Sequence, residues 1–337
     1  MNPLFEKIRH TAAGFQEASI ILAAAELDVF TAVVKLGNTA SAKQLADTLQ
    51  VDVRGITALL DALAAMELLN KKEQNYSVRA DNLELLNSTS PQTMIPLLRH
   101  MACCQRRWTQ LSFAAKNGEP PKPADSFLGA EEDGKSFIMG MNSIAVNLVN
   151  ETVKSLQQSG VLPFPKENIR FIDIGGASGT YTAAFLDAMP EAEGTVFDLP
   201  VGIAAAKKRF IGSRYEPRVQ LAAGDFTVDE LPAGFDFAWL SAIIHQFDRS
   251  ESKTMFQKIY RALNSCGKLA IRDFVLNPER TAPKAGVLFG VNMLVGTKTG
   301  RVYSFAEIKE DLEYAGFTNV QLAVPAETMS AVVVAQK

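Results

Sequence analysis

From residue 168 onward the chain alternates short apolar runs with segments of helical spacing. The apolar runs are NIRFIDIGG, GTVFDLP, RVQLAAGDF, FDFAWLSAII and GKLAIRDFVL, and the helical segments include TYTAAFLDAM, VGIAAAKKRF and SKTMFQKIYRAL. Strands that are apolar along almost their whole length are typical of parallel sheets with helices on both faces. The alternation therefore predicts an α/β domain with a doubly wound sheet over residues 161–337.

The end of the chain departs from this alternation. FTNVQLAVPA and SAVVVAQK read as two strands with no helix between them. Two strands joined so closely must pair antiparallel. We therefore expect a reversed strand near one edge of the sheet.

The first half of the chain is mainly helical. FQEASIILAAAELDVFTAVVKLG predicts one helix that ends at Gly37, and the next thirty or so residues predict two short helices that break near Val51–Asp52. NKKEQNYSVRA then predicts a hairpin. Helix, turn, helix and wing are the parts of a winged-helix module, which we place at residues 1–85.

A winged helix can read DNA or bind a protein partner. A DNA-reading helix presents basic and amide side chains to a groove. Between Asp52 and Leu69 the second helix offers only Arg54 as a basic residue, against Asp52, Asp61 and Glu67. The composition argues against phosphate contacts and favours a structural or dimerising role. We expect a homodimer through this module and no nucleic acid partner.

Overall composition limits the remaining classes of function. The formal net charge of −3 gives no electrostatic footprint for nucleic acid or anionic lipid. There is no uninterrupted apolar run of about 18 residues, so we expect no membrane segment. The three cysteines, Cys103, Cys104 and Cys266, are too few for a disulfide framework or a metal cage. We therefore expect a cytoplasmic protein with reduced thiols and no metal.

A glycine-rich loop follows the first strand in FIDIGGASGTYTAAF. Ligands of doubly wound sheets bind beyond the carboxyl ends of the strands, and Gly175, Gly176 and Gly179 lie at such an end. Glycine allows a sharp turn and a close approach of the backbone to a ligand. The loop lacks the lysine of a phosphate-binding loop, and Ile174 occupies the position of the first glycine in the nicotinamide fingerprint.

Three carboxylates end successive strands. Asp173 would repel a pyrophosphate but can hold an ammonium group, directly or through water. Asp198 can accept both hydroxyls of a ribose, and Asp225 is placed for an adenine amino group with Phe226 against the ring. A ligand with ammonium, ribose and adenine but no phosphate fits this set, and S-adenosylmethionine is that ligand. Alternatively, these acids are only turn formers and helix caps. The predicted cofactor-binding residues at this edge are Asp173, Gly175, Gly176, Gly179, Asp198, Leu199, Gly224, Asp225 and Phe226.

Almost the whole chain resembles a known family through eight stretches. These are LDVFTAV, DIGGASGTY, VFDLP, AGDF, LSAIIHQFDRSES, RDFVL, APKAGVLFGVNMLV and YSFAEIKEDLEYAGF. They are similar to the bacterial relatives of plant caffeic-acid-type and acetylserotonin-type O-methyltransferases. The resemblance implies a winged-helix dimerisation domain and a Rossmann-like, class I S-adenosylmethionine-binding domain. In two places the chain departs from the family: Ala177 replaces the third glycine of the loop, and His245-Gln246-Phe247 replaces His-Asp-Trp.

The resemblance implies that His245 is the general base. The fourth apolar run leads into it, so we expect it at the end of that strand. Methyl transfer needs an aligned nucleophile that loses a proton, and imidazoles, which titrate near neutral pH, suit that step. His10 lies near the terminus and His100 lies in a helix, so both read as structural or surface residues. Alternatively, His245 is a strand-end residue that only forms hydrogen bonds.

Two further residues acquire roles by the same resemblance. Asp273 matches a glutamate that follows the next strand in the plant relatives. Aspartate is shorter, so it reaches His245 only with help from water or serves another purpose, and the adjacent Arg272 could equally neutralise it in an ion pair. Ser241 matches a position near the carboxylate of the cofactor, where plant enzymes often have lysine.

Residues 86–160 predict a helical connector that contributes to the acceptor pocket, with helices ending at Gly118 and Gly160. Asn292 and Met293 match positions that line the acceptor pocket of the family. Methionine and aromatic residues there favour an aromatic or polyketide-like hydroxyl acceptor, although the same residues at helical spacing are often plain core, and an asparagine can simply cap a helix. The predicted substrate-binding residues are Trp108, Met139, Phe289, Asn292 and Met293, with Phe137 nearby.

Alternatives to O-methyl transfer remain open at this stage. The acceptor atom could be nitrogen or carbon in the same fold. An enzyme of this family could also use the bound cofactor for hydroxylation, decarboxylation or pericyclic chemistry. A regulator that senses the cofactor through its winged helix is a third class, and the shortage of basic residues argues against it. A metal-dependent catechol-type mechanism needs clustered carboxylates and an asparagine at suitable spacing, which the sequence lacks.

Overall fold

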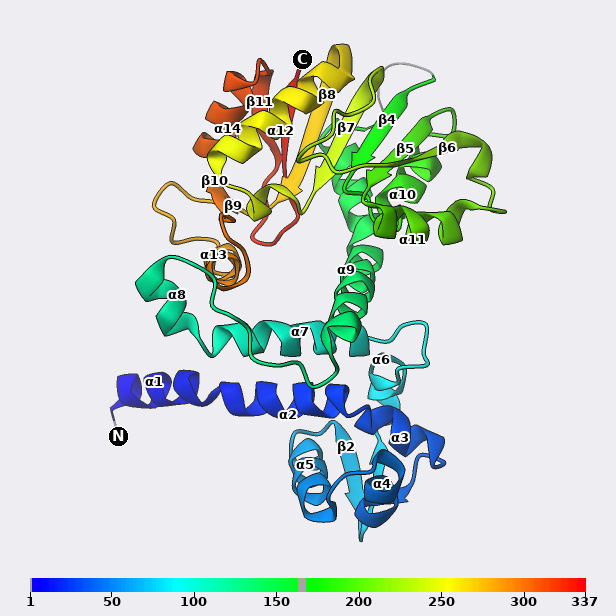
Figure 1. Cartoon of the computed structure of the whole chain (residues 1–337), viewed down its shortest axis with the longest axis vertical. Coiled ribbons are helices and arrows are strands. Elements are labelled where there is room, and N and C mark those ends of the chain that lie inside the picture. Colours follow the sequence, from blue (N-terminus) through cyan, green and yellow to red (C-terminus); the bar gives the residue numbers. More distant parts are fainter. Residues whose placement is uncertain (1, 163–167) are drawn as a thin grey trace. The chain divides into compact units, whose positions relative to one another are not determined.

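The computed structural model describes residues 2–162 and 168–337. They divide into two compact units (Figure 1). The first unit comprises the chain up to Thr109 together with Pro123–Ile144, and the second comprises Gln110–Lys122 and Ala145–Lys337. The three-part division inferred from the sequence, 1–85, 86–160 and 161–337, remains a proposal.

The first unit contains the predicted winged helix. Asp52 caps the second helix of the module by accepting a hydrogen bond from the Gly55 amide at 2.8 Å, which explains the break before it. Three short strands pair antiparallel in the order β1-β3-β2, and β2 and β3 form the predicted wing. The elements are α1 (Pro3–Ala13), α2 (Phe15–Glu26), α3 (Val29–Lys35), β1 (Ala40–Ser41), α4 (Ala42–Leu49), α5 (Val53–Ala65), β2 (Leu69–Lys72), β3 (Asn75–Val78), η1 (Ala80–Asn82), α6 (Leu83–Leu86), α7 (Ile95–Trp108) and the first part of α9 (Ala130–Gln158).

Two helices predicted as continuous are interrupted. The helix expected to end at Gly37 breaks at Asp28, whose backbone is left-handed with φ 56°. The Asp28 carboxylate accepts hydrogen bonds from Thr31 at 2.7 Å and from Ser88 at 3.2 Å, so a contact distant in sequence stabilises the break. The helix expected to end at Gly118 is likewise two helices, α7 and α8 (Leu111–Asn117). Of the described helices, none combines the length and the apolar composition that crossing a bilayer requires.

The second unit is built on a seven-stranded sheet with the order β11-β12-β8-β7-β4-β5-β6 (Figure 1). Five strands, from β6 to β8, are parallel, and β12 is antiparallel to both of its neighbours. The predicted reversed strand is therefore confirmed, one place in from the edge. The strands are β4 (Arg170–Ile174), β5 (Glu193–Asp198), β6 (Val219–Ala223), β7 (Phe235–Ser241), β8 (Leu263–Asp273), β11 (Thr318–Val324) and β12 (Ala331–Gln336).

Helices cover both faces of this sheet. Tyr181 and Phe185 of α10 pack with Trp239 of β7 and with the second part of α9 on one face. Met255 and Phe256 of α12 pack with the opposite face. The remaining elements are α10 (Thr180–Ala188), α11 (Pro200–Phe210), η2 (Glu216–Arg218), η3 (Ile244–Gln246), α12 (Arg249–Ala262), β9 (Val275–Leu276), α13 (Lys284–Gly296), β10 (Tyr303–Ser304) and α14 (Phe305–Tyr314).

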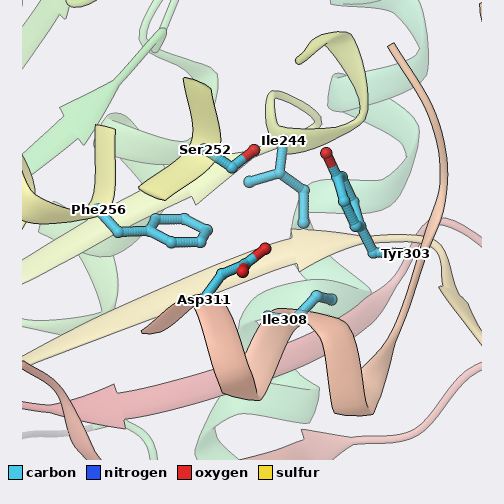
Figure 2. Close-up of a pocket in the computed structure, with 6 residues that line it drawn as sticks. All are labelled: Ile244, Ser252, Phe256, Tyr303, Ile308 and Asp311. Atoms are coloured by element: carbon cyan, nitrogen blue, oxygen red, sulfur yellow. The ribbon is translucent and has the colours of Figure 1, made fainter. Parts of the chain in front are cut away.

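A buried carboxylate joins α14 to α12. Figure 2 shows the side chain of Asp311 extending from α14 toward Ser252 of α12, with Ile244 and Tyr303 close by. Asp311 is 1% exposed, and its carboxylate accepts hydrogen bonds of 2.6 to 3.1 Å from Arg249. The Lys253 ammonium lies 3.4 Å away. This ion pair connects the first turn of α12 to α14.

Replacing Asp311 with alanine should lower the free energy of unfolding by about 2–4 kcal/mol, because two cations lose their buried partner. The loss stays below that of a fully buried pair because Arg249 is partly exposed and keeps Glu310. Urea unfolding measures the change. Glu310→Ala is the matched control, since it removes an exposed partner of the same arginine and should change stability little. Equal losses in the two variants would contradict the buried role of Asp311.

Candidate active site

The loop between β4 and α10 needs its glycines for both turn and packing. Gly175 and Gly179 have φ of +69° and +72°, in the left-handed region that favours glycine. A Cβ on Gly175 would lie 2.6 Å from Cδ1 of Ile243, and one on Gly179 would collide with the ring of Phe210. Ala177, which replaces the usual glycine, also has a positive φ of 46°, so the chain accepts backbone strain there.

Asp173 lies beneath this loop. It is 2% exposed, and its Oδ2 accepts a hydrogen bond from the Thr182 hydroxyl at 2.7 Å. Burial raises the pKa of its carboxyl to about 7, against the opposing effect of the Thr182 bond. A Cβ on Gly176 would meet this carboxylate at 2.7 Å. The glycine thus keeps a buried acid next to the loop.

Asp198 ends β5, as predicted, and accepts hydrogen bonds from the loops that follow β4, β5 and β6. Its Oδ2 accepts a hydrogen bond from the Ala177 amide at 2.8 Å, and its Oδ1 accepts one from Leu199 at 2.7 Å. Its main-chain oxygen accepts a bond from Gly224 at 3.0 Å. Each carboxylate oxygen keeps a further lone pair for a ligand hydroxyl. Burial raises the pKa of this carboxyl, against the two amide bonds.

Asp225 and Phe226 lie just beyond the third strand. β6 ends at Ala223, so Asp225 stands two residues past the strand end where the sequence placed it. Its Oδ1 accepts hydrogen bonds from the Thr227 amide and hydroxyl at 2.9 and 2.6 Å, and these bonds lower its pKa. The Phe226 ring packs edge-on against Phe247 with centroids 5.9 Å apart.

His245 is not at the end of a strand. β7 stops at Ser241 because Ala242 adopts a positive φ of 56°, and His245 lies in the short η3 turn. Its Nδ1 lies 3.0 and 2.9 Å from the two carboxylate oxygens of Asp273, the last residue of β8. Since β7 and β8 are parallel neighbours, both groups emerge at the same edge of the sheet. The aspartate therefore reaches the imidazole without an intervening water.

This contact determines which ring nitrogen carries the proton. An ionised carboxylate only accepts hydrogen bonds, so Nδ1 of His245 donates to Asp273 and Nε2 keeps its lone pair. The pair is buried, with His245 7% and Asp273 1% exposed. A histidine held in this tautomer can accept a proton through Nε2.

Two further contacts fix the turn that carries His245. The Phe289 ring lies edge-on to the imidazole, with centroids 4.8 Å apart and planes at 90°. The Arg301 amide donates to the main-chain oxygen of His245 at 2.8 Å, and a Cβ on Gly300 would lie 2.6 Å from that oxygen. The segment that follows α13 therefore supports the turn that carries His245.

Arg272 does not neutralise Asp273. Its NH1 donates to the Ser241 hydroxyl at 3.0 Å, and its guanidinium lies 5.6 Å from the centre of the Tyr181 ring. Neighbouring residues of a strand point to opposite faces of the sheet, which separates the two side chains. The alternative of an Arg272–Asp273 ion pair, open at the level of sequence, is therefore wrong.

The predicted substrate-binding residues come from both units. Trp108 and Met139 belong to the first unit, on α7 and α9, and Met139 is 54% exposed. Phe289, Asn292 and Met293 belong to α13 in the second unit, where Met293 is 6% exposed. Phe289 contacts the candidate base directly. A shared acceptor pocket formed by all five stays a prediction.

Several residues that support the candidate site were not predicted from the sequence. Thr182 holds Asp173, Ile243 covers Gly175, and Gly300 with Arg301 supports His245. Only the glycine at 300, in a loop of small and polar residues, gives a signal in the sequence. Among the residues that the structure describes, no three histidine, cysteine or acidic side chains gather as metal ligands would.

Comparison with known proteins gives matches over nearly the whole chain. Residues 127–318 match the model of an O-methyltransferase domain, and residues 9–82 match that of an O-methyltransferase dimerisation domain. The chain is 29% identical to 3-hydroxy-5-methyl-1-naphthoate 3-O-methyltransferase of Streptomyces sahachiroi, over 92% of this chain and 88% of that one. It is 26% identical to acetylserotonin O-methyltransferase of Gallus gallus, over 92% and 91% of the two chains. The solved structure of PigF with SAH superposes with a TM-score of 0.85 at 24% identity, over 98% and 99% of the two chains.

Proposed function

Because the chain belongs to the O-methyltransferase family, we propose that it transfers a methyl group from S-adenosylmethionine to a hydroxyl group of a small aromatic or polyketide-like acceptor, with His245 as the general base. The contact between His245 Nδ1 and the Asp273 carboxylate carries this proposal. It leaves a proton acceptor, Nε2, at the edge of the sheet where the predicted cofactor-binding residues lie.

The residues at this edge fit the cofactor by their chemistry. Asp198 offers two oxygens with free lone pairs to the ribose hydroxyls, and Leu199 beside it is 47% exposed, an apolar surface suited to the adenine. Asp225, whose pKa is lowered, stays ionised for the adenine amino group. Asp173, whose pKa burial raises to about 7, would be held in its charged form by the ammonium end of the bound cofactor. Gly175, Gly176 and Gly179 carry no side chain, which allows the backbone of the loop to approach such a ligand closely.

When bound, S-adenosylmethionine supplies a methyl group activated by the sulfonium charge. The chain contributes the rest. Asp273 holds the imidazole in the tautomer with Nε2 unprotonated, and His245 removes the proton of the acceptor hydroxyl as the oxygen attacks. Phe289, edge-on to that imidazole, offers a ring surface next to the base for an aromatic acceptor.

The names of the relatives support the class of acceptor. The Streptomyces relative acts, by its name, on the hydroxyl of a naphthoate, and the Gallus relative acts on acetylserotonin. Both acceptors are aromatic. A screen with methyl-labelled cofactor tests the proposal: hydroxylated aromatic and polyketide-like compounds should gain label at oxygen. Label that appears only at nitrogen or carbon would overturn the acceptor assignment.

Replacing Asp198 with alanine should weaken the binding of S-adenosylhomocysteine by about 1–3 kcal/mol, because the ribose hydroxyls lose a charged acceptor. Isothermal titration calorimetry measures this. Glu216→Ala serves as control, since that exposed carboxylate accepts from the Gly212 amide away from the sheet edge. Wild-type affinity in Asp198→Ala would reject the ribose role.

We also propose that two copies of the chain associate through the N-terminal domain. The dimerisation model covers residues 9–82, and α1, which overlaps the start of this match, exposes Leu4, Phe5 and Ile8, each more than half accessible. Sedimentation should give twice the mass of one chain, and Phe5→Asp with Ile8→Asp should shift it toward the monomer. A wild-type monomer at micromolar concentration would contradict the proposal.

A further inference from the structure

Arg272 places a positive charge inside an apolar layer of the second unit. It is 4% exposed and belongs to the face of β8 on which Ala270 packs with Tyr181 and Trp239. On β12 its partner in register is Val332, another residue of that apolar cluster. A charged side chain in such surroundings is rarely stable without a counter-charge.

The neighbours of Arg272 supply no counter-charge. Its NH1 donates to the Ser241 hydroxyl, and the Tyr181 ring faces the guanidinium at 5.6 Å. Its Nε is buried and has no hydrogen-bond partner. Within residues 2–162 and 168–337, no carboxylate forms an ion pair with it. A neutral hydroxyl and a ring face only partly compensate a buried cation, so the site lacks an anion.

The position of Arg272 indicates which anion this is. Ser241 is the last residue of β7 and pairs with Arg272 in the parallel register. Arg272 approaches Tyr181 on the first turn of α10, and Asp173 accepts from Thr182, the next residue of that helix. The buried carboxyl group of Asp173 and the buried guanidinium of Arg272 thus contact neighbouring residues in the first turn of α10. An α-amino acid, with ammonium and carboxylate on one carbon, has the matching pair of charges.

We propose that Arg272 binds the carboxylate at the amino-acid end of S-adenosylmethionine, and that Ser241 orients the guanidinium for this contact. The inference rests on the proposed function, because it takes the cofactor as given and assigns one further residue to it. The bound carboxylate provides the missing counter-charge by accepting hydrogen bonds from the guanidinium. Arg272 thereby contributes to ligand binding rather than to folding.

Calorimetric titration with two ligands separates this role from a structural one. S-adenosylhomocysteine carries the amino-acid end, whereas 5′-methylthioadenosine retains adenine, ribose and sulfur without it. Arg272→Met keeps most of the side-chain volume and removes the charge. It should weaken S-adenosylhomocysteine binding roughly 10- to 100-fold, leave methylthioadenosine binding unchanged, and leave the melting temperature unchanged or raised.

Two matched variants complete the experiment. Arg272→Lys keeps the charge and should recover part of the affinity for S-adenosylhomocysteine. Arg218→Met removes a half-buried arginine that donates to main-chain oxygens from Leu186 to Ala192. It should lower the melting temperature while the ratio of the two affinities stays at the wild-type value.

Three results would overturn the inference. Equal weakening of both ligands in Arg272→Met would assign the residue to the fold alone. Unchanged binding of both ligands, with a raised KM for a carboxylate-bearing acceptor, would place the anion on the acceptor instead. Wild-type protein that binds neither ligand would remove the proposed function itself, and with it this assignment; the first two results leave the proposed function intact.

Discussion

Replacing His245 with alanine should lower the turnover of methyl transfer by ~10²–10⁴-fold and leave the affinity for S-adenosylhomocysteine nearly unchanged. We propose the imidazole as the group that takes the proton, and the contacts we assign to the cofactor come from other residues. Steady-state rates with a phenolic acceptor measure the first effect, and calorimetry measures the second.

The pH dependence of this variant provides a sharper test. A phenol ionises by itself near pH 10, so the gap between wild type and His245→Ala should narrow as the pH approaches that value. The matched control is Gln246→Ala, which changes the exposed neighbour of His245 on the same turn and should keep wild-type turnover. A gap that stays constant up to alkaline pH would mean that His245 positions the acceptor rather than removing its proton.

Replacing Asp273 with asparagine should cost turnover on a similar scale, ~10²–10⁴-fold, although the side chain keeps its shape. The amide offers an NH2 group where the carboxylate offered two acceptors, so the imidazole is no longer held with its proton on Nδ1. In serine protease triads the same substitution acts through the wrong tautomer. Rates with the labelled cofactor again measure the effect.

The alternative for Asp273 is a purely structural role, since it is buried and also accepts from the Phe274 amide at 2.8 Å. A positioning role predicts that Asp273→Asn retains cofactor affinity, and that its deficit, like that of His245→Ala, shrinks at alkaline pH. Asp273→Glu, which restores a carboxylate, should recover part of the activity. A deficit that follows the fraction of unfolded protein, with no recovery by glutamate, would assign Asp273 to the fold.

The parts of the fold that follow from local pattern were predictable. Apolar runs gave the parallel strands, and the missing helix after Val324 gave the reversed strand β12. The helix break at Asp28 was not predictable, because Ser88, sixty residues away, stabilises it. The same holds for Ala242, whose positive φ ends β7 three residues before His245 and turns the imidazole toward Asp273.

The sequence pattern placed the candidate site near the carboxyl ends of the parallel strands, but it did not predict the contacts of the candidate residues. Strand alternation alone already separates Arg272 from Asp273, so their ion pair could have been discounted from the sequence. In contrast, no local pattern announces Thr182 as the partner of Asp173, since that bond joins a helix to a strand. Burial of Asp173, which raises its pKa to about 7, likewise depends on the packed structure.

The central claim is that the carboxylates at or just beyond the ends of β4, β5 and β6 form a site for a phosphate-free adenosyl cofactor. Titration of the purified chain with S-adenosylhomocysteine and, separately, with a nicotinamide dinucleotide tests it most directly. The account predicts saturable heat with one S-adenosylhomocysteine per chain and none with the dinucleotide. Tight binding of the dinucleotide, with no heat from S-adenosylhomocysteine, would contradict it.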